Sequence, residues 1–337
     1  MRSRRFKMNP DKVLAVYHCM SRSVNGEKIF EPADREVLRK LVHRVADYCG
    51  VRILTYAIMP NHFHLLIEVP RRGTPSDAEL LRRYKVLYPK PSPFKPERPE
   101  VIEQHLKSGS AEGMLWRKRQ LALMGDISPF MKLLKQRFSI WFNRTHGRFG
   151  TLWSERFKSL LVEPEMKAMR AVAAYIDLNA VRAGLVEDPK DYRFCGYAEA
   201  VAGGRAAREG IERVAGAPWG RAQRRYRLAL YGVGVEERPG KASLSREADE
   251  AVLEREGRLS LAAQLRCRLR WMGEGVALGS EGFIRARLED YRQMTGRKRK
   301  SEPVRPPGVG EAEGLTVLNR GRNRNPALEK TVLREFF

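Results

Sequence analysis

Two strand-like segments of this chain are separated by only two residues, and this spacing limits the folds open to it. Residues 51–59 and 62–69 are rich in β-branched and aromatic side chains, and Pro60-Asn61 lies between them. Strands joined by so short a connection pair antiparallel, because parallel strands need a crossover of a dozen or more residues. The chain therefore does not fit a strictly alternating parallel βα fold.

The segments around this hairpin predict a small sheet covered by helices. Residues 13–21 read as a first strand, and Pro32 opens an amphipathic helix that ends at Gly50. Adjacent strands covered by helices indicate an α+β fold. Further along, the same reasoning predicts a helix capped by Ser128 that closes at 146–147, a strand over 151–162 and a helix over 165–184.

Composition divides the chain into three regions. Residues 1–200 carry the strand and helix pattern, with a Pro-rich and helical insertion at about 88–125. Residues 201–300 form a basic and mostly helical extension, in which 259–294 has the element order of a helix-turn-helix, although generic basic helices explain it equally well. Helices are expected here over 222–231, 244–272 and 281–294. Residues 301–337 are expected to be a largely disordered tail.

The chain carries a large excess of positive charge. Its 337 residues include 64 Lys plus Arg against 40 Asp plus Glu, a formal net charge of +24. Such an excess usually faces phosphate, so nucleic acid is the expected partner and an anionic membrane surface the alternative. We expect no signal peptide and no membrane span, and the scattered cysteines are typical of free thiols in a reducing cytoplasm: Cys19, Cys49, Cys195 and Cys267.

Two histidines lie two residues apart on the second strand of the hairpin. Side chains alternate along a strand, so His62 and His64 project from one face while Phe63 packs on the other. Imidazole suits several divalent metals, and such a pair can hold one cation. Two ordinary half-buried histidines are the alternative interpretation.

A tyrosine on the helix over 165–184 has polar neighbours at helical spacing. Tyr175, Asn179 and Arg182 share one helical face, because residues three or four apart stack on one another. A tyrosine at the edge of the core, beside a solvated Asn and Arg, is the alternative. The neighbouring apolar face, which we expect to contact the sheet, comprises Met169, Val172, Ile176 and Ala180.

Four sequence blocks in order make residues 10–200 resemble the REP-associated tyrosine transposases, which are IS200-like members of the HUH single-tyrosine transposases. The blocks are Tyr17-His-Cys-Met-Ser-Arg22, Met59-Pro-Asn-His-Phe-His64, Gly150-Thr-Leu-Trp-Ser-Glu-Arg-Phe-Lys-Ser159 and Tyr175-Ile-Asp-Leu-Asn-Ala-Val-Arg-Ala-Gly-Leu-Val186. The resemblance implies an antiparallel sheet of ferredoxin-like type and metal-dependent cleavage of single-stranded DNA.

The resemblance also implies roles for particular residues. His62, His64 and Asn179 would be ligands of Mg²⁺ or Mn²⁺, and Tyr175 would be the nucleophile that forms a 5′-phosphotyrosine. An unperturbed tyrosine has a pKa near 10 and needs its surroundings to make it a nucleophile. The family usually has Pro where this chain has Ala180.

Basic residues in the same blocks are candidate DNA contacts. They are Arg22, Arg156, Lys158 and Arg182, with solvated surface as the alternative for the first three. The implied partner is single-stranded DNA that folds into a hairpin, at the nucleoid in the cytoplasm, and a homodimer is compatible with the family.

Other tyrosines and other functions compete with this interpretation. Tyr192 and Tyr197 lie beyond the helix and are expected to pack in the core rather than to act as nucleophiles. A non-catalytic DNA-binding regulator on the same fold is the main alternative. A second alternative is a metal-dependent nuclease in which water, instead of Tyr175, is the nucleophile.

Overall fold

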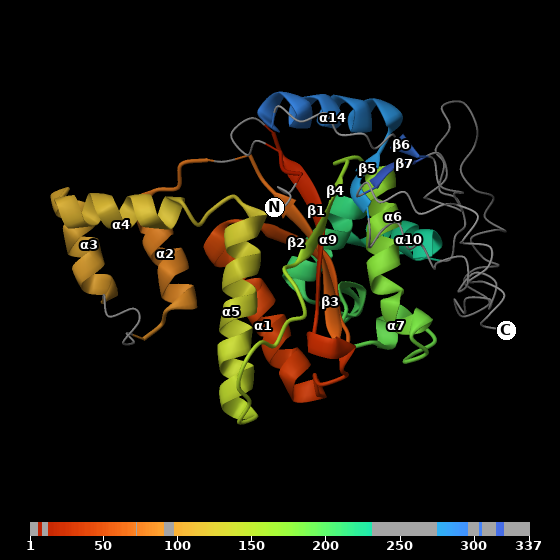
Figure 1. Ribbon diagram of the computed structural model, residues 1–337, viewed down its shortest axis with the longest axis horizontal. Helices are drawn as coiled ribbons and strands as arrows, with labels where there is room; N and C mark the ends of the chain where they lie inside the picture. Colours follow the sequence, from red (N-terminus) through yellow and green to blue (C-terminus); the bar gives the residue numbers. More distant parts are fainter. Residues whose placement is uncertain are drawn as a thin grey trace.

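A seven-stranded sheet runs through the centre of the molecule (Figure 1). The computed structural model describes residues 6–8, 13–71, 73–90, 98–230, 275–295, 303–304 and 315–319. The strand order is β2-β3-β1-β4-β5-β7-β6. The strands are β1 (Ala15–Arg22), β2 (Arg52–Ile58), β3 (His62–Val69), β4 (Lys158–Val162), β5 (Gly275–Gly279), β6 (Pro303–Val304) and β7 (Thr316–Asn319).

Helices connect and cover these strands. They are α1 (Pro32–Cys49), α2 (Asp77–Leu87), α3 (Pro99–Ser108), α4 (Ala111–Leu121), α5 (Ile127–Thr145), α6 (Met166–Asp177), α7 (Asn179–Arg182), α8 (Gly196–Val201), α9 (Arg205–Ala215), α10 (Trp219–Leu230) and α14 (Glu281–Thr295), with short 3-10 turns η1 (Val24–Gly26) and η2 (Pro189–Asp191). Within the described residues, no helix has both the length and the apolar character needed to cross a bilayer.

The first four strands have the ferredoxin-like arrangement. Along the chain the elements follow the order β1-α1-β2-β3-α5-β4 once the insertion is set aside, and in space the strands follow the order β2-β3-β1-β4. Every neighbouring pair among these four is antiparallel. The predicted α+β class and antiparallel sheet are confirmed.

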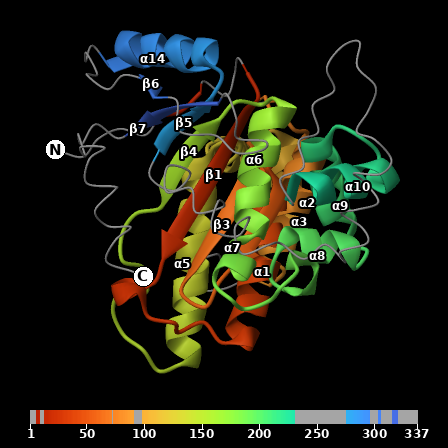
Figure 2. The same ribbon diagram turned by 90° about the vertical axis from the view of Figure 1, so that its right-hand side faces the viewer.

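Helices cover both faces of this sheet. Figures 1 and 2 show α1 and α5 on one face, and α6 with α8, α9 and α10 on the other. Phe63 of β3 points to the α5 side, where its ring packs against Trp153, which also lies against Phe138 of α5. Since side chains alternate along a strand, the residues on either side of Phe63 point to the α6 side.

The predicted insertion over 88–125 contains two helices, α3 and α4, beside the main body. In Figure 1, α3 and α4 lie away from the sheet, and α2 joins them to α1. Residues 91–97, the centre of the Pro-rich stretch, lie outside the described residues.

Two predictions in the middle of the chain are corrected by the structure. The strand expected over 151–162 is confined to β4. The segment before it buries the apolar side chains of Leu152, Trp153 and Phe157, but its backbone bends through the exposed residues 154–156 and contributes only an isolated bridge between Trp153 and Ser23. The N-cap of α5 is Asp126 rather than Ser128. The Asp126 carboxylate accepts the backbone N–H of Ser128 at 2.7 Å and so captures a donor of the first turn.

The C-terminal region differs from its prediction in the parts that the structure describes. Residues 275–279, expected as a turn between helices, form β5 parallel to β4, and the expected disordered tail contributes β6 and β7. These apolar strands cover the edge of β4, which would otherwise expose unpaired backbone groups. The predicted helix over 281–294 is confirmed as α14, whereas that over 244–272 lies outside the described residues.

Candidate active site

The two candidate histidines lie on the sheet face that α6 covers. In the β1–β3 ladder His62 is paired with Arg22, and His64 with Met20. Directly paired residues point to the same face of an antiparallel sheet, so all four side chains share one surface. His64 is buried at 4% exposure and His62 is half-buried near the strand end. The predicted common face of the two histidines is confirmed.

Tyr175 of α6 extends over the same surface. Its ring centroid lies 5.8 Å from that of His64 and 5.8 Å from that of His18, both in edge-on contact. The rings of His62 and His64 are 5.0 Å apart and almost perpendicular. An extended segment and a distant helix therefore bring a phenol and the imidazole pair together.

The two histidines are held in their neutral form. Burial lowers the pKa of His62 to about 4, and the positive charges of Arg22 and Arg182 act in the same direction. Burial also lowers the pKa of His64 well below its usual value, and the neighbouring His18 and His62 rings act in the same direction because adjacent imidazoles oppose each other's protonation. Neutral imidazole is the form that binds a metal.

Each histidine has one ring nitrogen already engaged. The Nδ1 atom of His62 lies 2.6 Å from Oδ1 of Asn61, and the Nδ1 atom of His64 lies 2.8 Å from Nε2 of His18. The Nε2 atoms of the pair are the nitrogens left to face a ligand. The donor chemistry therefore fits a divalent cation that prefers imidazole.

Asn179 lies where the predicted single helix breaks. Helix α6 ends at Asp177 and α7 begins at Asn179, whose Nδ2 atom donates to the backbone oxygens of Tyr175 at 3.0 Å and Ile176 at 3.1 Å. The amide nitrogen is thus committed to its own helix, and Oδ1 is the atom that can act as a ligand. Within the described residues no group of three or more His, Cys, Asp or Glu could hold a metal. A cation here would depend on the two histidines and Asn179.

Arg182 contacts the candidate nucleophile directly. Its guanidinium lies 4.1 Å from the centroid of the Tyr175 ring, and its Nη2 atom donates to the Tyr175 backbone oxygen at 2.9 Å. The predicted polar face of Tyr175, Asn179 and Arg182 therefore survives the helix break.

The other three basic candidates lie near the same end of the sheet. Arg22 is exposed at the end of β1. Lys158 is paired with Met20 in the β1–β4 ladder, so it shares the histidine face, and it forms an ion pair with Glu155 at 3.0 Å. Arg156 is exposed in the segment before β4, where the Ser154 backbone N–H donates to the Arg22 carbonyl.

Two rival tyrosines are packed in the core, as the structure shows. The Tyr192 hydroxyl donates to the Ile58 backbone oxygen at 2.8 Å and receives a hydrogen bond from Arg35. Tyr197 is fully buried. Neither side chain is presented to the histidine face as Tyr175 is.

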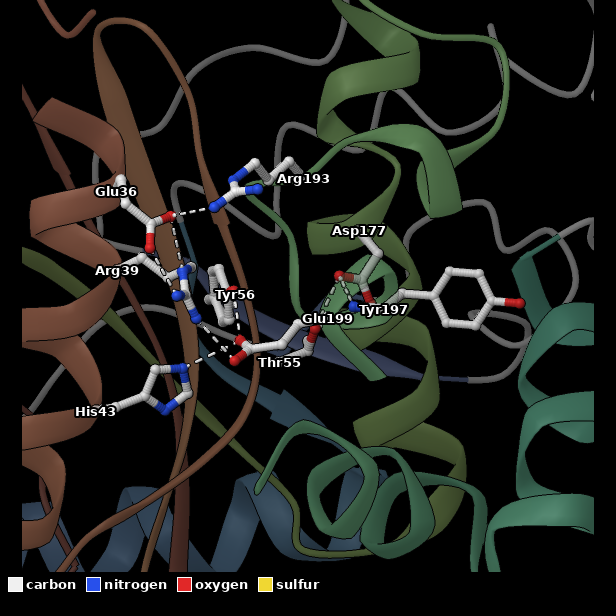
Figure 3. A network of polar contacts seen from close by, with 9 residues as sticks. All are labelled: Glu36, Arg39, His43, Thr55, Tyr56, Asp177, Arg193, Tyr197 and Glu199. Carbon is white, nitrogen blue, oxygen red and sulfur yellow. Dashed lines mark hydrogen bonds and ion pairs between the residues drawn. The ribbon is translucent and has the colours of Figure 1, made fainter. Parts of the chain in front are cut away.

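A buried carboxylate that the sequence analysis missed fixes the end of α6. Thr55 of β2 donates to Oδ1 of Asp177 at 2.7 Å, Tyr226 of α10 donates to Oδ2 at 2.5 Å, and the Tyr197 backbone N–H donates at 3.3 Å. Figure 3 shows Asp177 between Thr55 and Tyr197. Burial raises the pKa of Asp177 to about 7, opposed by these donors. The contacts tie α6 to the sheet two residues after Tyr175.

A second polar network braces α8 against α1 and β2 (Figure 3). The Glu199 carboxylate accepts hydrogen bonds from Tyr56 at 2.6 Å and Arg39 at 2.8 Å, and His43 lies at 3.1 Å. Burial alone would raise the pKa of Glu199, but the hydrogen bonds from His43 and Tyr56 hold that pKa at about 2. This network stabilises the layer that carries the site.

His18 and Asn61 are site residues that the sequence analysis did not single out. Both lie in the blocks that carry the family resemblance. Alternation along β1 places His18 on the same face as Arg22, four residues later, so strand periodicity was the available signal.

The fold and site together define a ferredoxin-like sheet that presents two imidazoles to a helical tyrosine. Residues 12–87 match the protein family described as "Transposase IS200 like". The match covers β1, α1, the β2–β3 hairpin and α2, and it confirms the predicted resemblance over these residues. A comparison with curated proteins finds no match.

The chain also resembles one solved structure of a REP-associated tyrosine transposase bound to a REP hairpin. The two are 15% identical, with a TM-score of 0.35, over 60% of this chain and 87% of that chain.

Proposed function

We propose that this protein is a metal-dependent strand transferase for single-stranded DNA, with Tyr175 as its nucleophile. The single observation that carries the proposal is the contact of the Tyr175 ring with His64 at 5.8 Å. Supporting it is the family match over residues 12–87, which contain both histidines.

In the proposed reaction, Oη of Tyr175 forms a bond to the phosphorus of a phosphodiester. The bond from phosphorus to the 3′ oxygen breaks, the departing oxygen takes up a proton, and the phenolic proton leaves to water. The products are a 5′-phosphotyrosine and a free 3′-OH. A 3′-OH from another strand can reverse the step, because the covalent bond conserves the energy of the phosphodiester.

His62, His64 and Asn179 would hold Mg²⁺ or Mn²⁺, of which Mn²⁺ tolerates imidazole better. When bound, the cation would polarise a phosphoryl oxygen of the DNA. The residues of the chain have the remaining tasks. Arg182 holds the Tyr175 ring by stacking, and α6 is fixed on the sheet by Asp177.

The DNA strand would lie at the sheet end where the basic residues gather. Arg22, Arg156 and Lys158 are the proposed phosphate contacts, and the formal net charge of +24 favours association with a polyanion. Hairpin-forming single strands are the substrates to test, and the nucleoid is the proposed place of action.

Tyr175 lies beside the histidines of its own chain. We therefore propose a site that is complete within one protomer, whether or not the protein forms a dimer.

Incubation with hairpin-bearing single-stranded oligonucleotides and Mn²⁺ tests the function. The expected result is an adduct that survives denaturing electrophoresis, is absent in a chelator, and is lost in Tyr175→Phe while DNA binding persists. Tyr88→Phe, in the insertion, is the matched control and should retain the adduct. Binding without an adduct under any metal condition would instead indicate the non-catalytic regulator.

A further inference from the structure

Behind the proposed metal ligands lies a second set of side chains that contact their rings. Asn61 and His18 each meet the Nδ1 atom of one ligand histidine, at 2.6 and 2.8 Å. We propose that Asn61 and His18 are positioning residues that fix which nitrogen of His62 and His64 is presented to a cation. The inference rests on the proposed function for the identity of the ligand pair.

The orientation of the Asn61 amide follows from the turn beside it. Its Nδ2 atom donates to the Gly26 backbone oxygen at 2.8 Å, so Oδ1 must be the atom facing His62. Gly26 and Asn25 both have left-handed backbone conformations, at φ 69° and 55°, and this turn brings the carbonyl to Asn61. Since Oδ1 can only accept, His62 carries its proton on Nδ1 and its Nε2 lone pair is exposed to a ligand.

The contact between His18 and His64 has the same consequence when His64 is the donor. Both rings are buried, at 0% and 4% exposure, and a hydrogen bond between two ring nitrogens holds only one proton. If His64 donates from Nδ1, its Nε2 atom can bind a cation. If His18 donates from Nε2, the proton of His64 lies on Nε2 and blocks binding. In the proposed arrangement, Nε2 of His18 accepts the hydrogen bond from Nδ1 of His64.

The two contacts engage the same ring nitrogen, Nδ1, in both proposed ligands. Both histidines are held through Nδ1 by neighbours on different elements, one at the β2–β3 connection and one on β1. His18 also contacts the Tyr175 ring edge-on at 5.8 Å, so one side chain touches a proposed ligand and the proposed nucleophile. Groups that orient metal-binding histidines in this way usually change metal affinity 10- to 100-fold when they are replaced.

Mn²⁺ affinity of the full chain, measured by calorimetry or by the electron paramagnetic resonance of free Mn²⁺, is the first test. His18→Phe keeps a ring in the buried space but offers no acceptor, and it should weaken Mn²⁺ binding 10- to 100-fold. His18→Gln restores an acceptor oxygen and should recover much of this loss. His105→Phe is the matched control on α3, away from the site, and should bind Mn²⁺ as the unmodified chain does.

The ¹⁵N spectrum of the histidine rings gives a second readout that needs neither metal nor DNA. In the unmodified chain His62 and His64 should both be protonated on Nδ1, and His18→Phe should shift His64 toward the Nε2-protonated form. Protonation of His64 on Nε2 in the unmodified chain would overturn the inference. Equal Mn²⁺ affinity of His18→Phe and the unmodified chain, with binding lost in His62→Ala, would overturn it as well.

These readouts separate the inference from the function on which it rests. If the tautomers are as stated but no DNA adduct forms, the strand-transfer proposal fails and the positioning roles stand. If an adduct forms while His64 is protonated on Nε2, the positioning roles fail and the function stands.

Discussion

The guanidinium of Arg182 stacks on the Tyr175 ring at 4.1 Å and also donates to the Tyr175 backbone oxygen. The same side chain thus contacts both the ring and the backbone of Tyr175 and places a positive charge over the ring. Interactions between a cation and an aromatic ring contribute about 0.5 to 2 kcal/mol.

Replacing this arginine should slow the chemical step more than it weakens DNA binding. Arg182→Met keeps an apolar chain of similar reach but removes the charge, and adduct formation in a single turnover should slow about tenfold, or roughly 1.4 kcal/mol. Arg285→Met on α14 removes an exposed arginine far from α7 and should leave the rate unchanged. An unaltered rate in Arg182→Met would exclude the positioning role.

The salt dependence of DNA binding should report the contact made by Arg22. Each phosphate contact on a single strand contributes about 0.7 to the slope of log affinity against log salt. Arg22→Gln should therefore reduce that slope by about 0.7, as fluorescence anisotropy at several salt concentrations can measure. Lys107→Gln, an exposed lysine of α3, is the control and should not change the slope. Equal slopes for Arg22→Gln and the unmodified chain would remove Arg22 from the DNA path.

Acid should weaken the network around Glu199. Its pKa is about 2 in the folded protein against a usual value of 4.5, so the folded state binds fewer protons than the unfolded state between these values. The stabilisation is complete above pH 4.5 and is lost as the pH falls toward 2. Glu199→Gln should lower the free energy of unfolding by about 1–3 kcal/mol at pH 7. The difference in unfolding free energy between the variant and the unmodified chain should become smaller on acidification, as urea unfolding at several pH values can show.

Glu209→Gln is the matched control for this experiment. Glu209 forms an exposed ion pair with Arg205 one helical turn away, which contributes little. If the difference in unfolding free energy between Glu199→Gln and the unmodified chain stays constant from pH 6 to pH 3, the assigned role of the carboxylate is contradicted.

Two glycines on neighbouring helices should respond oppositely to the same substitution. A Cβ on Gly210 of α9 would lie 2.3 Å from the Leu54 backbone oxygen of β2, so Gly210→Ala must push the helix off the sheet and should cost about 1–3 kcal/mol. A Cβ on Gly220 of α10 would meet no atom of the described residues within 4 Å. Gly220→Ala should be neutral or stabilise by up to about 1 kcal/mol. Thermal unfolding of the two variants compares them, and equal melting temperatures would contradict this packing.

Most elements up to α7 were predictable because they carry local signals, whereas α8 and α9 were not predicted. The two-residue connection at Pro60-Asn61 required a hairpin, and Pro32 and Gly50 marked the ends of α1 within a residue. The same periodicity placed His62 and His64 on one face and Tyr175 beside Arg182.

The remaining features depend on contacts between distant segments. Strand β5 is short, contains two glycines and is defined by its pairing with β4 more than 110 residues earlier, which no local pattern reveals. In the sequence, Asp177 looks like an ordinary helix residue. Its role depends on Thr55 of β2 and Tyr226 of α10, which are distant in the chain and donate hydrogen bonds to it in the fold. The contact of His18 with His64 depends on the register of β1 against β3, which the sequence does not give.

Mass spectrometry of the trapped protein–DNA complex identifies the residue that becomes linked to DNA. Trypsin releases residues 171–182 as one peptide in which Tyr175 is the single tyrosine, whereas Tyr192 and Tyr197 fall in other peptides. After nuclease digestion, we expect a nucleotide remnant on the peptide 171–182. A remnant on a peptide with Tyr192 or Tyr197, or free 5′-phosphate ends with no modified peptide, would contradict it.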